Sequence, residues 1–79
     1  MPYIVYILRC QDGSLYTGIT NDLVKRLAAH KNGTGAKYTR AHKPDRIMHT
    51  EKYRTKGRAL KREIEIKNLS RAQKEKIFT

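Results

Sequence analysis

The sequence predicts an α+β fold in which helices flank a small three-stranded antiparallel sheet. Its 79 residues suffice for one domain with a thin core. Residues 3–9 read YIVYILR, a run of β-branched and aromatic residues that predicts a strand. Later segments place apolar residues at helical spacing behind capping residues. The expected order is β-β-α-(turn)-β-α-α, in a single domain that spans residues 1–79.

The first strand is expected at the centre of the sheet. Both of its faces are largely apolar, as in a strand that is covered on two sides. Asp12-Gly13 predicts a hairpin turn, and residues 15–19 form the return strand. Residues 46–53, RIMHTEKY, predict a third and weaker strand.

A first helix is predicted directly after the hairpin. Thr20 or Asn21 is expected to cap it, and Asn32-Gly33 ends it. Its predicted apolar stripe consists of Leu23, Val24, Leu27 and Ala28. A glycine-rich segment with at most one helical turn follows and is stopped by Pro44.

Two more helices are predicted at the end of the chain. Thr55 caps a helix that runs from about residue 56 to residue 68. Ser70 and Gln73 form a capping box for a short last helix that ends near Ile77.

The helix predicted from residue 56 contains a carboxylate among apolar residues. At about 100° per residue, Glu63 falls between Ala59 and Leu60, whereas Glu65 falls on the solvent side. The predicted apolar face consists of Ala59, Leu60, Ile64, Ile66 and Leu69. Burying an unpaired carboxylate is costly. Either an ion pair with Lys67 or a divalent cation would compensate for it, and the pattern alone does not decide between them.

Arg26 and His30 lie one turn apart at the border of the first apolar stripe. The structural interpretation pairs Arg26 with Asp22 and makes His30 a cation at the helix C-terminus, which the helix dipole favours. The functional interpretation places both in a site. Gly18, inside the second strand, marks either a β-bulge or a close approach to the backbone.

The chain is strongly basic. It carries 18 lysines and arginines against 7 aspartates and glutamates, a net charge of +11 and a pI near 10.2. This balance favours nucleic acid as a partner. A membrane is not expected, because no helix combines a wide apolar face with aromatic anchors. The single cysteine, Cys10, excludes an internal disulfide and fits a reducing cytoplasm.

Four elements in order resemble the GIY-YIG nuclease superfamily. The first half-motif appears as VYI at residues 5–7 and the second as YTG at residues 16–18. Arg26 and His30, four residues apart, match the next element. The segment ALKRE matches the last and places the family's metal-binding glutamate at Glu63. The resemblance covers nearly the whole chain and is strongest to small stand-alone bacterial members.

The resemblance implies hydrolysis of phosphodiester bonds in DNA with one Mg²⁺ or Mn²⁺ ion. Glu63 would bind the ion, and Arg26 would clamp the phosphate and stabilise developing charge. Gly18 would leave room for the metal and phosphate. Further basic residues would contact backbone phosphates without reading sequence, namely Lys25, Lys37, Arg40, Lys56, Arg58 and Arg62.

Tyr6 or Tyr16 would then position or deprotonate the attacking water, with nearby cations lowering the pKa of the tyrosine. His30 is the alternative base, or orients the others. This arrangement requires both tyrosines on one face of the sheet. A three-residue hairpin loop, which pairs Cys10 with Tyr16, satisfies that requirement, so this register is predicted.

Two other interpretations stay open. A catalytically weak nucleic-acid-binding module would keep the fold, although such a module would be expected to lose Glu63 first. A basic RNA- or ribosome-associated protein would explain the charge but not the inward glutamate. For the nuclease, we expect recognition of DNA structure or strand ends and a role in DNA repair. A thin core makes dimerisation plausible, but the sequence does not determine the oligomeric state.

Overall fold

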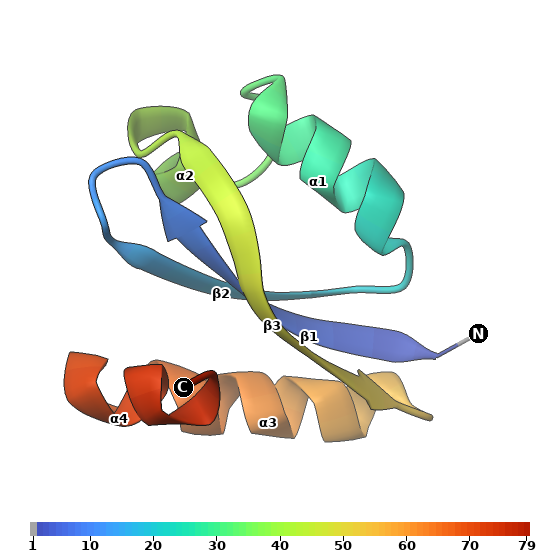
Figure 1. Cartoon of the computed structure of the whole chain (residues 1–79). Helices are drawn as coiled ribbons and strands as arrows, with labels where there is room; N and C mark the ends of the chain where they lie inside the picture. The colour runs from blue at the N-terminus through green and yellow to red at the C-terminus, as the bar shows by residue number, and fades with distance from the viewer. Residues whose placement is uncertain (1) are drawn as a thin grey trace.

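The computed structural model describes residues 2–79 and has three layers (Figure 1). A three-stranded sheet in the order β2-β1-β3 forms the middle layer. Helices α1 and α2 cover one face, and α3 and α4 cover the other (Figure 1). The elements are β1 (Tyr3–Cys10), β2 (Leu15–Thr20), α1 (Leu23–Lys31), α2 (Lys37–Ala41), β3 (Pro44–Tyr53), α3 (Lys56–Lys67) and α4 (Arg71–Ile77). The predicted α+β class and element order are confirmed.

Strand β1 is central, as its apolar faces predicted. Successive side chains of a strand point to opposite faces, so β1 supplies two separate cores. Val5 and Ile7 pack with Ala59 and Ile66 of α3. Tyr6 and the other even-numbered residues of β1 face α1 and α2 on the opposite side. The side chains on that face form the second core, which contains the buried polar side chains of the candidate site.

The hairpin register differs from the predicted one by two residues. Leu8, not Cys10, pairs with Tyr16, and Tyr6 pairs with Gly18. Cys10 donates its N–H to the carbonyl of Ser14, so these two residues close the hairpin and the turn keeps three residues, 11–13 instead of the predicted 12–14. A shift of two residues preserves the face of every side chain. Tyr6 and Tyr16 therefore share a face, as the site required.

The helix termini follow local capping chemistry. Asp22, rather than Thr20 or Asn21, caps α1 by accepting the N–H of Lys25 at 3.1 Å. Thr20 is occupied by its own hydrogen bonds to the backbone of Asp22. The predicted caps of α3 and α4 are confirmed, including the capping box of α4. Gly33 follows α1 with a φ of 77°, a left-handed conformation that favours glycine.

The buried faces of two helices are narrower than predicted. Val24 of α1 is 80% exposed, and Ala28 is also exposed. On α3, Leu60 and Ile64 are exposed, although both were assigned to the apolar face. A three-stranded sheet offers each helix a narrow contact strip, so only part of an apolar stripe is covered. No helix among residues 2–79 is long and apolar enough to cross a membrane.

A carboxylate on β3 organises a polar cluster at the sheet. Glu51 accepts hydrogen bonds from Tyr53 at 2.6 Å and from Arg62 at 2.9 and 3.2 Å. His49 contacts its second oxygen at 2.7 Å. Burial raises the pKa of Glu51, but these hydrogen bonds outweigh burial and lower it to about 2. The cluster is thus a fully paired anion that joins β3 to α3.

Replacing Glu51 with Gln is expected to destabilise the protein by about 2 kcal/mol, since Arg62 loses its charged partner in a half-buried position. For a domain of this size that is a fall of about 10 °C in Tm. The pKa of Glu51 is depressed from 4.5 to about 2, so its stabilisation is complete above pH 4.5 and is lost as the pH falls toward 2. Thermal unfolding at several pH values checks both effects. A Glu51→Gln protein with native Tm would contradict them.

Candidate active site

A chain of buried hydrogen bonds links β1, α1 and α2. The Tyr6 hydroxyl lies 2.8 Å from Nε2 of His30. Nδ1 of His30 lies 2.7 Å from the Thr39 hydroxyl, which donates to the carbonyl of Ala36 at 3.0 Å. Tyr6, His30 and Thr39 are all nearly inaccessible to solvent. His30 is therefore not the exposed C-terminal cation of the structural interpretation.

The chain determines the proton positions on His30. Because Thr39 gives its proton to Ala36, it can only accept from His30, so Nδ1 carries a hydrogen. Burial and the charge of Arg26 lower the pKa of His30, which favours the neutral ring. Nε2 of a neutral ring with a protonated Nδ1 is an acceptor. We therefore assign Tyr6 as the donor in its bond to His30.

The pKa of Tyr6 moves opposite to the sequence-based expectation. Burial raises it, and a hydrogen bond from Arg26 opposes burial without reversing it. Nearby cations therefore do not turn Tyr6 into a phenolate on their own. The hydrogen-bond partner of its hydroxyl is the acceptor nitrogen of His30.

Tyr16 and Gly18 of β2 complete the aromatic side of the site. The ring centroid of Tyr16 lies 6.3 Å from the ring centroid of Tyr6 and 5.4 Å from that of His30. A Cβ on Gly18 would lie 2.5 Å from the Tyr6 hydroxyl and 3.1 Å from the Tyr16 ring. The glycine thus makes room for the Tyr6 hydroxyl, which is a more specific reason than the space for metal and phosphate expected from the sequence.

Replacing Gly18 with Ala is expected to displace Tyr6 and to cost about 2 kcal/mol, since the new methyl group has no space. For the nuclease that the resemblance implies, loss of the Tyr6–His30 geometry should also lower cleavage by about 100-fold. The matched control is Gly57→Ala, because no atom lies within 4 Å of a Cβ built there. Chemical denaturation and a cleavage assay measure the two effects. Equal behaviour of the two variants would disprove the steric argument.

Arg26 has a buried nitrogen that lacks a partner. Within residues 2–79, its Nε is the one buried side-chain polar atom without a hydrogen bond. The predicted pair with Asp22 does not form, because Asp22 instead caps α1. The guanidinium interacts with the hydroxyls of Tyr6 and Tyr16. A buried donor without an acceptor is costly, so this N–H retains an unused capacity to bind an anion.

A groove of about 420 Å³ opens beside Arg26, between β2 and the start of α3. Thr20, Asn21 and Lys56 also line it. Two cations, Arg26 and Lys56, thus line one groove together with polar side chains. Such a groove suits the backbone of a nucleic acid.

Glu63 faces inward, as the helical wheel predicted. Its side chain is 15% exposed, and its charge contributes to raising the pKa of Tyr6. Lys67 approaches it at 3.5 Å, so the predicted i, i+4 ion pair is also present. Glu65 is exposed, as expected. The ion pair and a cation-binding role are compatible, because a carboxylate has two oxygens and Lys67 is half exposed.

Sequence reasoning missed two residues that hold His30 in place. Thr39 fixes its tautomer, and Gly35 leaves room for its ring, since a Cβ there would clash with Nδ1. Both lie in the segment for which the sequence predicted only a glycine-rich stretch with at most one helical turn. The available signal was Gly35 itself. Its backbone is not in the left-handed conformation, so the need for a glycine there has another cause.

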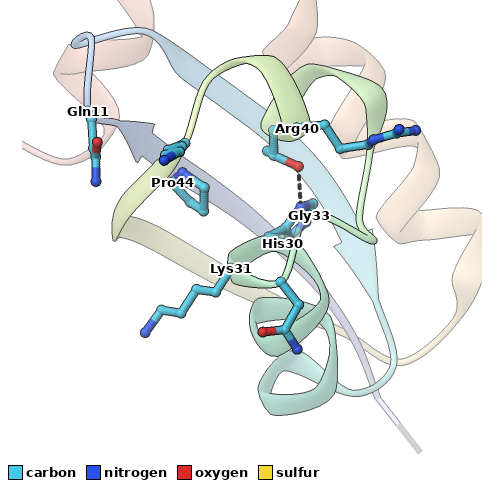
Figure 2. Close-up of a pocket in the computed structure, with 9 residues that line it drawn as sticks. Gln11, His30, Lys31, Gly33, Arg40 and Pro44 are labelled. Atoms are coloured by element: carbon cyan, nitrogen blue, oxygen red, sulfur yellow. Dashed lines mark hydrogen bonds between the residues drawn. The ribbon is translucent and has the colours of Figure 1, made fainter.

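A second hollow, of about 350 Å³, lies on the Nδ1 side of His30 (Figure 2). Gln11, Pro44 and the His30–Thr39 hydrogen bond border it. Figure 2 shows Lys31 and Arg40 extending away from each other around it. Lys31, Arg40 and Lys43 line the hollow, so it gathers positive charge beside the buried Thr39 end of the hydrogen-bond chain.

The remaining basic residues divide into free and occupied cations. Arg62 is bound to Glu51, so we withdraw it from the predicted phosphate contacts. The other five are exposed, namely Lys25, Lys37, Arg40, Lys56 and Arg58. None of these five forms an ion pair within residues 2–79. They remain candidates for binding a polyanion.

Comparison with known proteins adds independent information. Residues 2–76 match the family described as the GIY-YIG catalytic domain. A UPF0213 protein of Halobacterium salinarum is 51% identical over 94% of this chain and 96% of its own length. A solution NMR structure of a UPF0213 protein from Bacillus halodurans has a TM-score of 0.63 and 47% identity, covering 98% of this chain and 82% of that one. A protein from E. faecalis, also solved by NMR, has a TM-score of 0.68 and 44% identity over the same shares.

Proposed function

Because the chain belongs to the GIY-YIG catalytic domain family, a nuclease family, we propose that it hydrolyses phosphodiester bonds in DNA with the help of one divalent cation. The observation that carries the proposal is the buried, unpaired Nε of Arg26 beside the Tyr6–His30 pair. A donor for phosphate and a path for a proton thus lie together. Glu63 adds a carboxylate near the same tyrosine.

The residues present fit a hard cation that keeps most of its own water. No group of three or more His, Cys, Asp or Glu residues that could enclose a metal occurs within residues 2–79. Mg²⁺ is commonly bound by one or two carboxylates, with waters and phosphate oxygens as the other ligands. Glu63 supplies one such carboxylate, so Mg²⁺ or Mn²⁺ is the proposed cofactor. When bound, the ion would polarise the phosphate and neutralise the leaving oxygen.

Tyr6 and His30 are proposed to act as one base. A water that attacks phosphorus transfers its proton to the Tyr6 oxygen, while Tyr6 passes its own proton to Nε2 of His30. The new P–O bond forms as the bond to the leaving oxygen breaks. His30 ends as a cation that is still held by Thr39 through Nδ1. The neutral tautomer assigned above is the form that this transfer requires.

Arg26 is proposed to hold the phosphate. Its Nε and terminal nitrogens form a planar donor set that matches two phosphate oxygens. The site is largely buried, so a charge-assisted hydrogen bond there is stronger than at the surface. Holding the phosphate also positions it for attack, which reduces the entropic part of the barrier.

The surrounding cations are proposed to bind the DNA backbone. Lys56 borders the groove beside Arg26, and the other exposed lysines and arginines extend this surface over α1, α2 and α3. Such contacts carry no sequence information and weaken steeply with salt. We therefore propose that the protein recognises DNA structure or strand ends and not a base sequence. We also propose that it acts in the cytoplasm and in DNA repair.

The test is to incubate the purified protein with supercoiled plasmid and with single-stranded DNA. Cleavage is expected with Mg²⁺ or Mn²⁺ and is expected to stop when EDTA is added. Cleavage that continues in EDTA would refute the metal requirement. Binding without cleavage in either metal would refute the nuclease and would favour a nucleic-acid-binding module.

A further inference from the structure

A series of parallel rings leads outward from the proposed active site. The Tyr38 ring lies 5.8 Å from that of Tyr16, at an angle of 22°. The His42 ring lies 4.3 Å from that of Tyr38, at an angle of 18°. The Tyr16 ring also packs edge-on against the ring of His30 in the proposed active site. The rings of Tyr38 and His42 therefore continue the aromatic side of the site toward the surface.

The outer two rings are accessible to solvent. Tyr38 is 36% exposed, and the His42 side chain is 38% exposed. An exposed tyrosine stacked on an exposed histidine is unusual for a ring that only fills a core, because aromatic side chains gain most when buried. Neither ring is used by the proposed hydrolysis.

The His42 ring is also held in a fixed orientation. Asp12 of the hairpin turn contacts Nδ1 of His42. Asp12 is itself anchored by the N–H of Ser14 at 3.0 Å and its hydroxyl at 2.6 Å. These hydrogen bonds to Asp12 lower its pKa below the ordinary range, so it is an anion at neutral pH. A rigid ring loses little conformational entropy when a ligand stacks on it.

Free cations neighbour the two aromatic residues in the sequence. Lys37, Arg40 and Lys43 lie on the same short segment, and all three are exposed. None of them forms an ion pair within residues 2–79. Exposed aromatic rings beside free cations are the features with which proteins bind single-stranded nucleic acid, by stacking on bases and contacting phosphates. The bases of a duplex are already stacked and paired, so they are not available to these rings.

We propose that Tyr38 and His42 form a stacking surface on which an unpaired base of a DNA strand packs against the outer ring, His42, supported by Tyr38, while a neighbouring phosphate occupies the Arg26 site. The inference rests on the proposed function, which it extends by naming single-stranded DNA as the substrate. Lys37, Arg40 and Lys43 contact phosphates on either side of the stacked base.

The test measures binding in EDTA, so that cleavage does not interfere. Fluorescence anisotropy compares three ligands of equal length and at one salt concentration: an oligothymidylate of about 16 nucleotides, the same strand without bases, and a blunt duplex. The native chain is expected to bind the oligothymidylate about tenfold more tightly than the baseless strand. Tyr38→Ala and His42→Ala should each reduce that ratio toward one, whereas Tyr38→Phe should retain it.

The control is Leu60→Ala, which removes a side chain of similar exposure from the opposite face of the sheet. It should leave all three affinities unchanged. A native protein that does not distinguish the two single strands would overturn the proposal. So would a Tyr38→Ala protein that weakens all three ligands equally, because this indicates a structural role. Base-dependent binding by a protein that cleaves nothing in Mg²⁺ would uphold the stacking surface and refute only the nuclease.

Discussion

The Glu63→Gln protein is expected to lose more than about 100-fold of its DNA cleavage while keeping its fold. The substitution preserves the volume of the side chain and removes one negative charge. Glu63 is the carboxylate whose charge acts on Tyr6, so the proposed divalent cation would lose the charged ligand assigned to it. The ion pair with Lys67 would also be lost, at a cost of about 0.5 kcal/mol or less. Rates at saturating Mg²⁺, together with Tm, measure the effect.

Glu65→Gln is the matched control for that experiment. It removes the same charge from the same helix two residues away, at an exposed position. A general electrostatic effect on DNA binding would alter both proteins similarly. A specific loss confined to Glu63 would assign the metal-binding role to that carboxylate. Equal rates for Glu63→Gln and the native protein would remove Glu63 from the mechanism.

The fold could be predicted because its strongest signals are local. The apolar strand β1, the cap at Thr55 and the Ser70–Gln73 capping box depend on neighbouring residues, and the structure confirms them. Glu63 was also accessible to this reasoning, because Ala59 and Ile66 define the buried line of α3 on their own. The resemblance then indicated the order of the site residues along the chain.

The features that the sequence did not predict depend on contacts between distant segments. Thr39 acquires its importance from His30, nine residues earlier, and no local pattern marks that pair. The same holds for Glu51, which binds Arg62 from another element. Val24 was misplaced because periodicity shows which residues are apolar and not how wide the covering surface is. Hydrogen-bond networks and contact widths are thus determined by tertiary structure.

Tyr6→Phe is expected to lower the rate of cleavage by about 1000-fold, because it removes the hydroxyl through which a proton reaches His30. Tyr16→Phe is the matched comparison. Tyr16 lies beside Tyr6, but the hydrogen bond to His30 comes from Tyr6. Equal losses in the two variants would mean that the relay through His30 is not the source of the effect.

The pH dependence tests the same relay from its other end. His30 accepts a proton only when it is neutral, and burial with the charge of Arg26 places its pKa below 6.5. The native rate should therefore be level near pH 7 and fall about tenfold per unit once the pH drops below that pKa. In Tyr6→Phe the fall should disappear, because His30 no longer receives the proton. Since the pKa of Tyr6 is itself raised, a tyrosine acting alone would instead give a rate that keeps increasing well above pH 7.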